Sequence, residues 1–281
     1  MALAINTLEG ERRPPLNGNI PIAAIGTSVP ENCQHIHHPR YPTTREEWTT
    51  FPVTRTKYDD GVVKGERLMI GGWSVMEEWE KNMEQLTVAR LLNDLPERAN
   101  ILIRGEGLGY CTEAFIRGLS MTGGGEIHVI ELHPEILEQG RKRTKRILKT
   151  LPPHQEKSIK MVWHEGDALK VTRGLRSNYF HRVRSDTFPL SKSEKDVNDV
   201  IDRDEIIRIM TDSGAFSPYV GHRSATPEQL AYMNTRYFRH IEQFVVPVTP
   251  PRDCHYYKDT EMAIMICKGP RKGEIVFQAS K

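Results

Sequence analysis

Short apolar runs alternate with longer segments of helical periodicity through the middle of the chain. The runs at residues 99–103, 126–131 and 159–164 have the length and pattern of strands, and helices are predicted between them at 112–119 and 134–148. This β-α-β-α-β order predicts a mostly parallel sheet with right-handed crossovers and helices on both faces. The chain is therefore expected to belong to the α/β class.

The pattern also predicts elements on either side of this core. Apolar residues spaced by three to four positions indicate a helix over 75–95. After the core, the pattern predicts a strand at 179–184, a helix at 204–210, a strand at 214–220, a helix within 227–244, and strands at 262–267 and 275–277. No internal repeat is visible.

The first 60 residues are irregular, because they carry many of the prolines and show little sustained periodicity. They also hold four aromatic side chains, whereas disordered tails are poor in such residues: Tyr41, Trp48, Phe51 and Tyr58. We therefore expect an N-terminal extension over residues 1–65, followed by one domain over residues 66–281. The extension is a tail or a lid that covers a ligand, and the aromatic residues favour the lid.

Composition narrows the function classes. The 281 residues include 39 basic and 37 acidic side chains, so the net charge of +2 gives no strong field for nucleic acid or membranes. The basic run at 141–146 is expected to be a solvated helix face. The chain shows no signal-peptide pattern or membrane-length apolar run, which favours a cytoplasmic protein with free thiols. The cluster Cys33, His35, His37 and His38 fits no familiar zinc spacing, and no metal site is expected.

Three glycines follow the first core strand, at Gly105, Gly107 and Gly109. Glycine allows a tight turn and a close approach of the backbone to a ligand. An acid ends the second strand, Glu131, where Rossmann-like folds contact ribose hydroxyls, and Asp167 follows the third strand, near the usual position of adenine. Together these features favour S-adenosylmethionine (SAM) over a dinucleotide. Taken singly, either acid could equally be a helix N-cap or a solvated side chain.

Two further carboxylates are candidates for chemistry. Asp186 follows a predicted strand and precedes Pro189, where the chain leaves the sheet, so it is expected at the lip of a binding crevice. Glu80 shares a helical stretch with Met76 and Trp79 and borders its buried face. A turn residue for Asp186 and a solvated helix residue for Glu80 are the alternatives.

Three motifs resemble those of guanidinoacetate N-methyltransferases, in the same order: Val75-Met76-Glu77-Glu78-Trp79-Glu80, Asp186-Thr187-Phe188-Pro189-Leu190-Ser191 and Asp253-Cys254-His255-Tyr256-Tyr257. The resemblance covers roughly residues 66 to 269. It implies a Rossmann-like class I SAM-dependent methyltransferase fold and N-methylation of a guanidino group. It also implies that Glu80 and Asp186 bind the guanidinium, with Asp186 as the base, and that SAM contacts Met76, Gly105, Gly107, Glu131 and Asp167.

The full set of candidates extends this list. Further cofactor contacts are expected at Glu106, Gly109 and Ala168, and further substrate contacts at Thr187, His222 and Arg223. An arginine in the segment 221–224 could hold a substrate carboxylate, or it could be solvated. The family usually has an acid two residues before its first glycine, where this chain has Ile103, so contact with the methionine end of SAM is expected to differ.

The expected function is therefore SAM-dependent N-methylation of a small guanidino compound, such as guanidinoacetate, arginine or a related guanidino acid. A methyltransferase acting on another small amine or acid and a non-catalytic SAM-fold binding protein are the alternatives. No nucleic-acid or membrane partner is expected, and a homodimer is left open.

Overall fold

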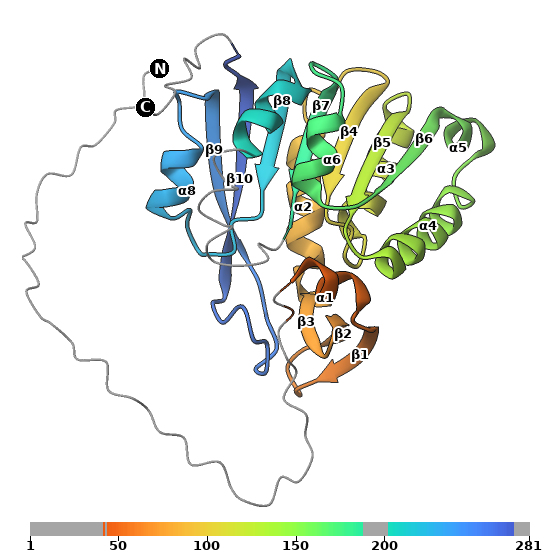
Figure 1. The fold of residues 1–281 in the computed structure, drawn as a ribbon, viewed down its shortest axis with the longest axis vertical. Coiled ribbons are helices and arrows are strands. Elements are labelled where there is room, and N and C mark those ends of the chain that lie inside the picture. The colour runs from red at the N-terminus through yellow and green to blue at the C-terminus, as the bar shows by residue number, and fades with distance from the viewer. Residues whose placement is uncertain (1–41, 43, 188–201, 273–281) are drawn as a thin grey trace, which may run out of the picture. The chain divides into compact units, whose positions relative to one another are not determined.

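The computed structural model describes residues 42, 44–187 and 202–272. Its main feature is a seven-stranded sheet with the strand order β6-β5-β4-β7-β8-β10-β9. The strands β4 (Ala99–Arg104), β5 (Gly125–Glu131), β6 (Ile159–Glu165), β7 (Phe180–Ser185) and β8 (Met210–Pro218) pair in parallel. The last two strands, β9 (Phe238–Pro247) and β10 (Glu261–Pro270), pair antiparallel with each other, and β10 also pairs antiparallel with β8. The predicted α/β class with a mostly parallel sheet is confirmed (Figure 1).

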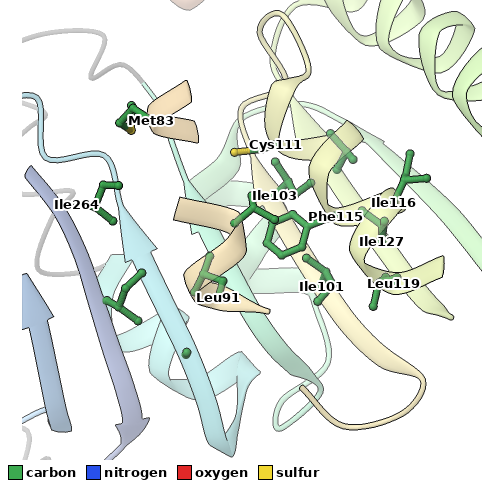
Figure 2. Close-up of a cluster of buried hydrophobic side chains, with 14 of the residues drawn as sticks. Met83, Leu91, Ile101, Ile103, Cys111, Phe115, Ile116, Leu119, Ile127 and Ile264 are labelled. Carbon is green, nitrogen blue, oxygen red and sulfur yellow. The ribbon is translucent and has the colours of Figure 1, made fainter. Parts of the chain in front are cut away.

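Helices cover both faces of this sheet. Successive residues of a strand point to opposite faces, so the apolar residues of a buried strand supply a cluster on each face. Ile101 and Ile103 of β4 belong to one buried cluster, together with side chains of α2 (Lys81–Leu91), α3 (Tyr110–Met121) and α4 (Pro134–Leu148). Figure 2 shows this cluster, with Phe115 and Leu119 of α3 beside the strand residues. Leu102, between the two isoleucines, belongs to the cluster on the other face, with residues of the helix at 202–209 and of α6 (Ala168–Gly174) beside it.

A separate three-stranded antiparallel sheet precedes the main sheet. It consists of β1 (Val53–Asp59), β2 (Lys64–Ile70) and β3 (Trp73–Glu77), with α1 (Arg45–Thr50) before it. Its apolar side chains, with Trp48 of α1, form a cluster that includes Leu108 and Tyr110. The expected boundary between residues 65 and 66 falls within β2, and the lid role of the N-terminal extension stays a prediction.

Three sequence expectations need correction. Residues 45–50 and 53–59 form α1 and β1, where the sequence pattern is irregular. The strand β1 buries a single side chain, so its sequence does not show the periodicity of a half-buried strand. The helix expected from residue 75 begins at Lys81, since 75–77 belong to β3 and pair with β2. The helix expected within 227–244 is limited to α8 (Pro227–Tyr232). The following apolar residues at three-residue spacing, Phe238, Ile241 and Phe244, lie in β9, where pairing with β10 overrides the helix-like pattern.

The remaining elements agree with the pattern within a few residues, including α4, whose bounds match the prediction. The short helix α5 (Pro153–Ser158) was not predicted. The strand expected at 275–277 lies outside the described residues. Within the described ranges, no helix combines the length and the apolar character needed to cross a bilayer.

Candidate functional site

A cavity of about 690 Å³ opens at the carboxyl ends of the parallel strands. Its lining includes Gly105 after β4, Glu131 of β5, Asp167 after β6 and Asp186 after β7. The strand β4 lies between β5 and β7, so the chain reverses its direction of sheet growth here. Ligands of open α/β sheets bind at such switch points. The sequence-predicted acids of the three successive strand ends are therefore brought to one cavity.

Two glycines of the loop at 105–109 pack too closely against their neighbours to carry side chains. Gly105 has a φ of +89°, and an added Cβ would lie 2.0 Å from the backbone oxygen of Asp186. Gly107 has a φ of +50°, and a Cβ there would lie 2.4 Å from Met76 Sδ. Both conformations are unfavourable for residues with a side chain. Met76, Gly105 and Gly107 line the cavity, whereas Gly109 is the N-cap of α3 and is not among the lining residues that the structure describes.

Glu131 holds the turn of the glycine loop. One of its oxygens accepts the backbone N–H of Glu106 at 2.9 Å, and the other accepts the backbone N–H of His133 at 2.9 Å. Each carboxylate oxygen can accept more than one hydrogen bond, so Glu131 can still contact ribose hydroxyls. Its carboxylate is buried at the cavity wall.

The side chain of Glu106 bonds to neighbouring helices. It accepts hydrogen bonds from Thr112 and from Arg143 of the basic run at 141–146. Burial raises the pKa of Glu106, and the charge of Arg143 opposes that effect. The basic run is therefore not uniformly solvated, since Arg143 is 17% exposed while Lys142 is 71% exposed.

Asp167 has two roles at the third strand end. It accepts the backbone N–H of Lys170 as the N-cap of α6, and its carboxylate lies 3.2 Å from the guanidinium of Arg45 in α1. Both Asp167 and Ala168 line the cavity. The N-cap role and the expected cofactor position are therefore compatible, and Arg45 joins the site from a segment that the sequence pattern left irregular.

Asp186 faces the cavity together with Thr187. Its side chain is 23% exposed, and its backbone N–H donates to the carbonyl of Arg104 at 2.8 Å. Burial raises the pKa of Asp186 to about 7, while the nearby Arg184 lowers it and Glu84 and Glu131 raise it. A carboxylate with this pKa exchanges its proton near neutral pH.

A buried ion pair beneath Asp186 was missed by the sequence reasoning. Arg184 of β7 donates to both oxygens of Glu84 in α2, and each side chain is 1% exposed. The thiol of Cys111 also donates to Glu84. All three residues are among those lining the cavity. The signal in the sequence was the pair of arginines at alternate positions of a buried strand, Arg182 and Arg184, because buried charges require partners.

Glu80 ends the 3-10 helix η1 (Glu78–Glu80) and is only 3% exposed. Its Oε1 accepts hydrogen bonds from the backbone N–H of Glu77 and from the hydroxyl of Tyr256. The pKa of Glu80 is raised to about 8, chiefly by burial and also by the charge of Asp186, while the hydrogen bonds from Tyr256 and Glu77 oppose this shift. Glu80 is not among the described lining residues, but Tyr256 is.

The first and third resemblance motifs pack on each other. The indole ring of Trp79 lies 5.4 Å from the ring of Tyr257 and 6.1 Å from that of Tyr256, measured between centroids. Asp253 accepts two hydrogen bonds from Arg67 of β2, at 2.8 and 2.9 Å. Segments more than 170 residues apart in the chain thus form one wall beside the cavity. The sequence motifs gave no role to Tyr256 or Arg67.

The expected carboxylate clamp is not brought to the cavity. Arg223 is 70% exposed and pairs with Glu261 at 2.6 Å, outside the lining residues that the structure describes. His222 does line the cavity, and its carbonyl accepts the backbone N–H of Ala263. A substrate carboxylate held by Arg223 would require that ion pair to open.

Two residues before Gly105, where the resembled family usually has an acid, this chain has an isoleucine that packs in the core. Ile103 is 1% exposed within the cluster around α3. The next residue, Arg104, donates to Asp202 at 2.6 Å and to Ser185 at 3.1 Å, and both Arg104 and Asp202 line the cavity. Among residues 42, 44–187 and 202–272, no group of three or more His, Cys, Asp and Glu side chains could hold a metal ion.

Comparison with known proteins supports the fold. The chain is similar to the crystal structure of spermidine synthase from Thermotoga maritima, with a TM-score of 0.52 and 13% identity over 79% of this chain and 74% of that one. It is also similar to spermidine synthase in complex with the transition state analogue AdoDATO, with a TM-score of 0.50 and 13% identity over 79% and 73% of the two chains.

A third similar structure is precorrin-6y C5,15-methyltransferase from Geobacter metallireducens GS-15. Its TM-score is 0.46, with 14% identity over 66% of this chain and 87% of that one, and it is too distant to inform the function. No protein-family model and no curated protein matches the chain. The comparisons therefore establish a Rossmann-like fold shared with spermidine synthase.

Proposed function

We propose that the protein is a SAM-dependent N-methyltransferase of a small guanidino compound. The observation that carries this proposal is the presence of Asp186, and of Tyr256 backed by Glu80, at the cavity that also holds the glycine loop and Glu131. A cavity of about 690 Å³ is within the usual range for small-molecule sites.

The residues present fit SAM. Glu131 presents a buried carboxylate at the end of β5, as ribose hydroxyls require, and Gly105 and Gly107 let the backbone turn next to it. Asp167, Ala168 and Met76 complete the candidate contacts. When bound, SAM supplies an electrophilic methyl group on a sulfonium centre. The fold is also shared with a spermidine synthase solved in complex with the transition state analogue AdoDATO.

The acceptor proposed is a cation, because the carboxyl group of Asp186 lines the cavity and that of Glu80 lies next to it, behind the hydroxyl of Tyr256. A guanidinium is planar and donates several N–H groups, which match carboxylate oxygens through charge-assisted hydrogen bonds. A bound cation favours the ionised form of Asp186, whose pKa in the free protein is about 7. The protein then orients one guanidino nitrogen toward the methyl donor, which can lower the barrier by several kcal/mol.

Full deprotonation of the guanidinium before transfer is too costly. Its pKa lies near 13, about 6 units above that of Asp186, which corresponds to roughly 8 kcal/mol. Proton loss is therefore coupled to methyl transfer, and the side chains of the cavity need only accept the proton as the nitrogen becomes methylated.

A panel assay tests the function. The protein is incubated with SAM and separately with guanidinoacetate, arginine, agmatine, guanidinobutyrate and matched amines without a guanidino group. S-adenosylhomocysteine and the methylated product are followed by mass spectrometry. We expect methylation on a guanidino nitrogen. Methylation of the amines alone would replace the guanidino assignment, and binding of SAM without turnover on any acceptor would favour a binding protein.

A further inference from the structure

The hydroxyl of Tyr256 stands between Glu80 and the cavity. Tyr256 is a lining residue, whereas Glu80 is 3% exposed and is not among the described lining residues. The hydroxyl donates a hydrogen bond to Glu80 Oε1. A tyrosine oxygen that donates in one direction can accept a hydrogen bond in another. A ligand in the cavity therefore meets Glu80 by way of Tyr256.

The surroundings hold this pair in place. The ring of Tyr256 packs on Trp79, one residue before Glu80, with centroids 6.1 Å apart. Glu80 Oε1 is fixed on its other side by the backbone N–H of Glu77 at 3.1 Å. Asp186 is near enough for its charge to raise the pKa of Glu80, and both carboxyl groups raise the pKa of Tyr219. Asp186, Tyr219 and Tyr256 thus line the cavity, and Glu80 lies behind Tyr256.

We infer that Tyr256 is a catalytic residue that contacts the acceptor nitrogen and relays its proton to Glu80, an inference that rests on the proposed function. The step begins with Glu80 ionised. As the bond from the nitrogen to the methyl carbon forms, the bond from that carbon to sulfur breaks, its electron pair stays on sulfur in S-adenosylhomocysteine, and the nitrogen loses one proton to the Tyr256 oxygen. The Tyr256 hydroxyl proton passes to Glu80 Oε1 in the same step. Tyr256 ends neutral, Glu80 ends as a carboxylic acid, and the methylated guanidinium keeps a single positive charge.

This arrangement divides the work between the two carboxyl groups. Asp186 lines the cavity and remains charged to hold the cation, while Glu80 is removed from the ligand and takes the proton. Burial raises the pKa of Glu80 to about 8, so its carboxylate can accept a proton near neutral pH. A base with a pKa near the working pH is the most effective proton acceptor.

Paired tyrosine variants test the relay. Tyr256→Phe removes the relaying hydroxyl, and Tyr257→Phe is the matched control, because Tyr257 also packs on Trp79 but donates to the carbonyl of Glu261. With the best acceptor of the panel, we expect Tyr256→Phe to lower kcat by about 100-fold or more. Tyr257→Phe should keep kcat close to wild type, and calorimetry should show unchanged SAM affinity in both.

A double variant separates the relay from two independent contributions. If Tyr256 and Glu80 act as one unit, Tyr256→Phe combined with Glu80→Gln should have a kcat no lower than the weaker single variant. If the fold-loss of kcat in the double variant equals the product of the two single fold-losses, the relay is overturned. A wild-type kcat in Tyr256→Phe would overturn it as well.

Two further outcomes remain decisive. Should Tyr256→Phe fail to fold, the pH profile of kcat decides. The relay predicts that kcat of the wild type rises with pH as Glu80 ionises, and that Glu80→Gln lacks this rise. An unchanged profile in Glu80→Gln would overturn the relay. Absence of methylation by the wild-type protein on every guanidino acceptor would reject the proposed function itself, before any variant is compared.

Discussion

The carboxylate of Asp186 lies 4.0 Å from the guanidinium of Arg184, which donates to both carboxylate oxygens of the buried Glu84. The positive charge of Arg184 is thus shared with a closer partner. Burial consequently outweighs the attraction and raises the pKa of Asp186 to about 7. The site is left ready for a cation, because an arriving guanidinium supplies the charge that Arg184 provides only in part.

The first prediction concerns the pH dependence of stability. Unfolded carboxyl groups titrate near pH 4, whereas the pKa of Glu80 is about 8 in the folded protein. The folded state therefore binds more protons between these values, and this contribution to stability is lost as pH rises through about 8. We expect Glu80→Gln to reduce the loss of stability between pH 6 and 9 by an amount on the order of a few kcal/mol.

Denaturant unfolding at several pH values measures this effect. Glu138→Gln is the control, because Glu138 is 51% exposed on α4 and forms its described ion pairs with Arg141 and Lys142 of the same helix, both of which are exposed. The same pH dependence in Glu80→Gln and in the wild type would contradict the assigned burial of the Glu80 charge.

The second prediction concerns the glycine loop. Gly105→Ala places a Cβ 2.0 Å from the Asp186 carbonyl oxygen at a φ of +89°, so the two strand ends must separate. We expect a loss of stability of at least about 1–3 kcal/mol, measured by denaturant unfolding. Gly174→Ala is the matched control, because no atom lies within 4 Å of its added Cβ and its φ is ordinary. Equal stability of the two variants would contradict the close packing of β4 and β7.

Much of the main sheet could be predicted from local pattern. The buried strands β4 and β5 and the helix α4 have strong periodicity and clear ends, so their sequence determines their structure almost alone. The strand β9 could not be predicted, because its apolar residues have helix-like spacing and its structure depends on pairing with β10, more than ten residues later in the chain. Tertiary pairing decided that segment.

The candidate site was predicted in the same uneven way. Glu131, Asp167 and Asp186 could be found because each lies at or just after the end of a strand, and strand ends meet at one edge of a parallel sheet. The partners of these acids could not be found. Glu84 comes from α2 and pairs with Arg184, one hundred residues away, and no local pattern links them. The placement of Tyr256 between Glu80 and the cavity likewise depends on tertiary packing.

The third prediction concerns the cofactor. Glu131→Ala removes the expected contact with ribose hydroxyls and also frees the backbone N–H groups of Glu106 and His133. We expect SAM affinity to fall by at least about 1.5–3 kcal/mol, measured by calorimetry. Glu135→Ala, in the first turn of α4, is a control that should bind SAM as the wild type does. Unchanged affinity in Glu131→Ala would mean that the cofactor binds elsewhere.

The fourth prediction separates acceptor chemistry from cofactor binding. Asp186→Asn preserves the shape of the side chain but removes its charge, and the buried Arg184 keeps Glu84 as its partner, so the fold should be retained. A bound guanidinium would then lack the carboxylate that holds it, and leaving a buried cation without its partner is costly. We expect near-complete loss of turnover with SAM affinity largely kept, measured by S-adenosylhomocysteine formation and calorimetry. Asp212→Asn, at a side chain 74% exposed on β8, should keep both properties. An Asp186→Asn protein that methylates its acceptor at the wild-type rate would return Asp186 to the role of a turn residue.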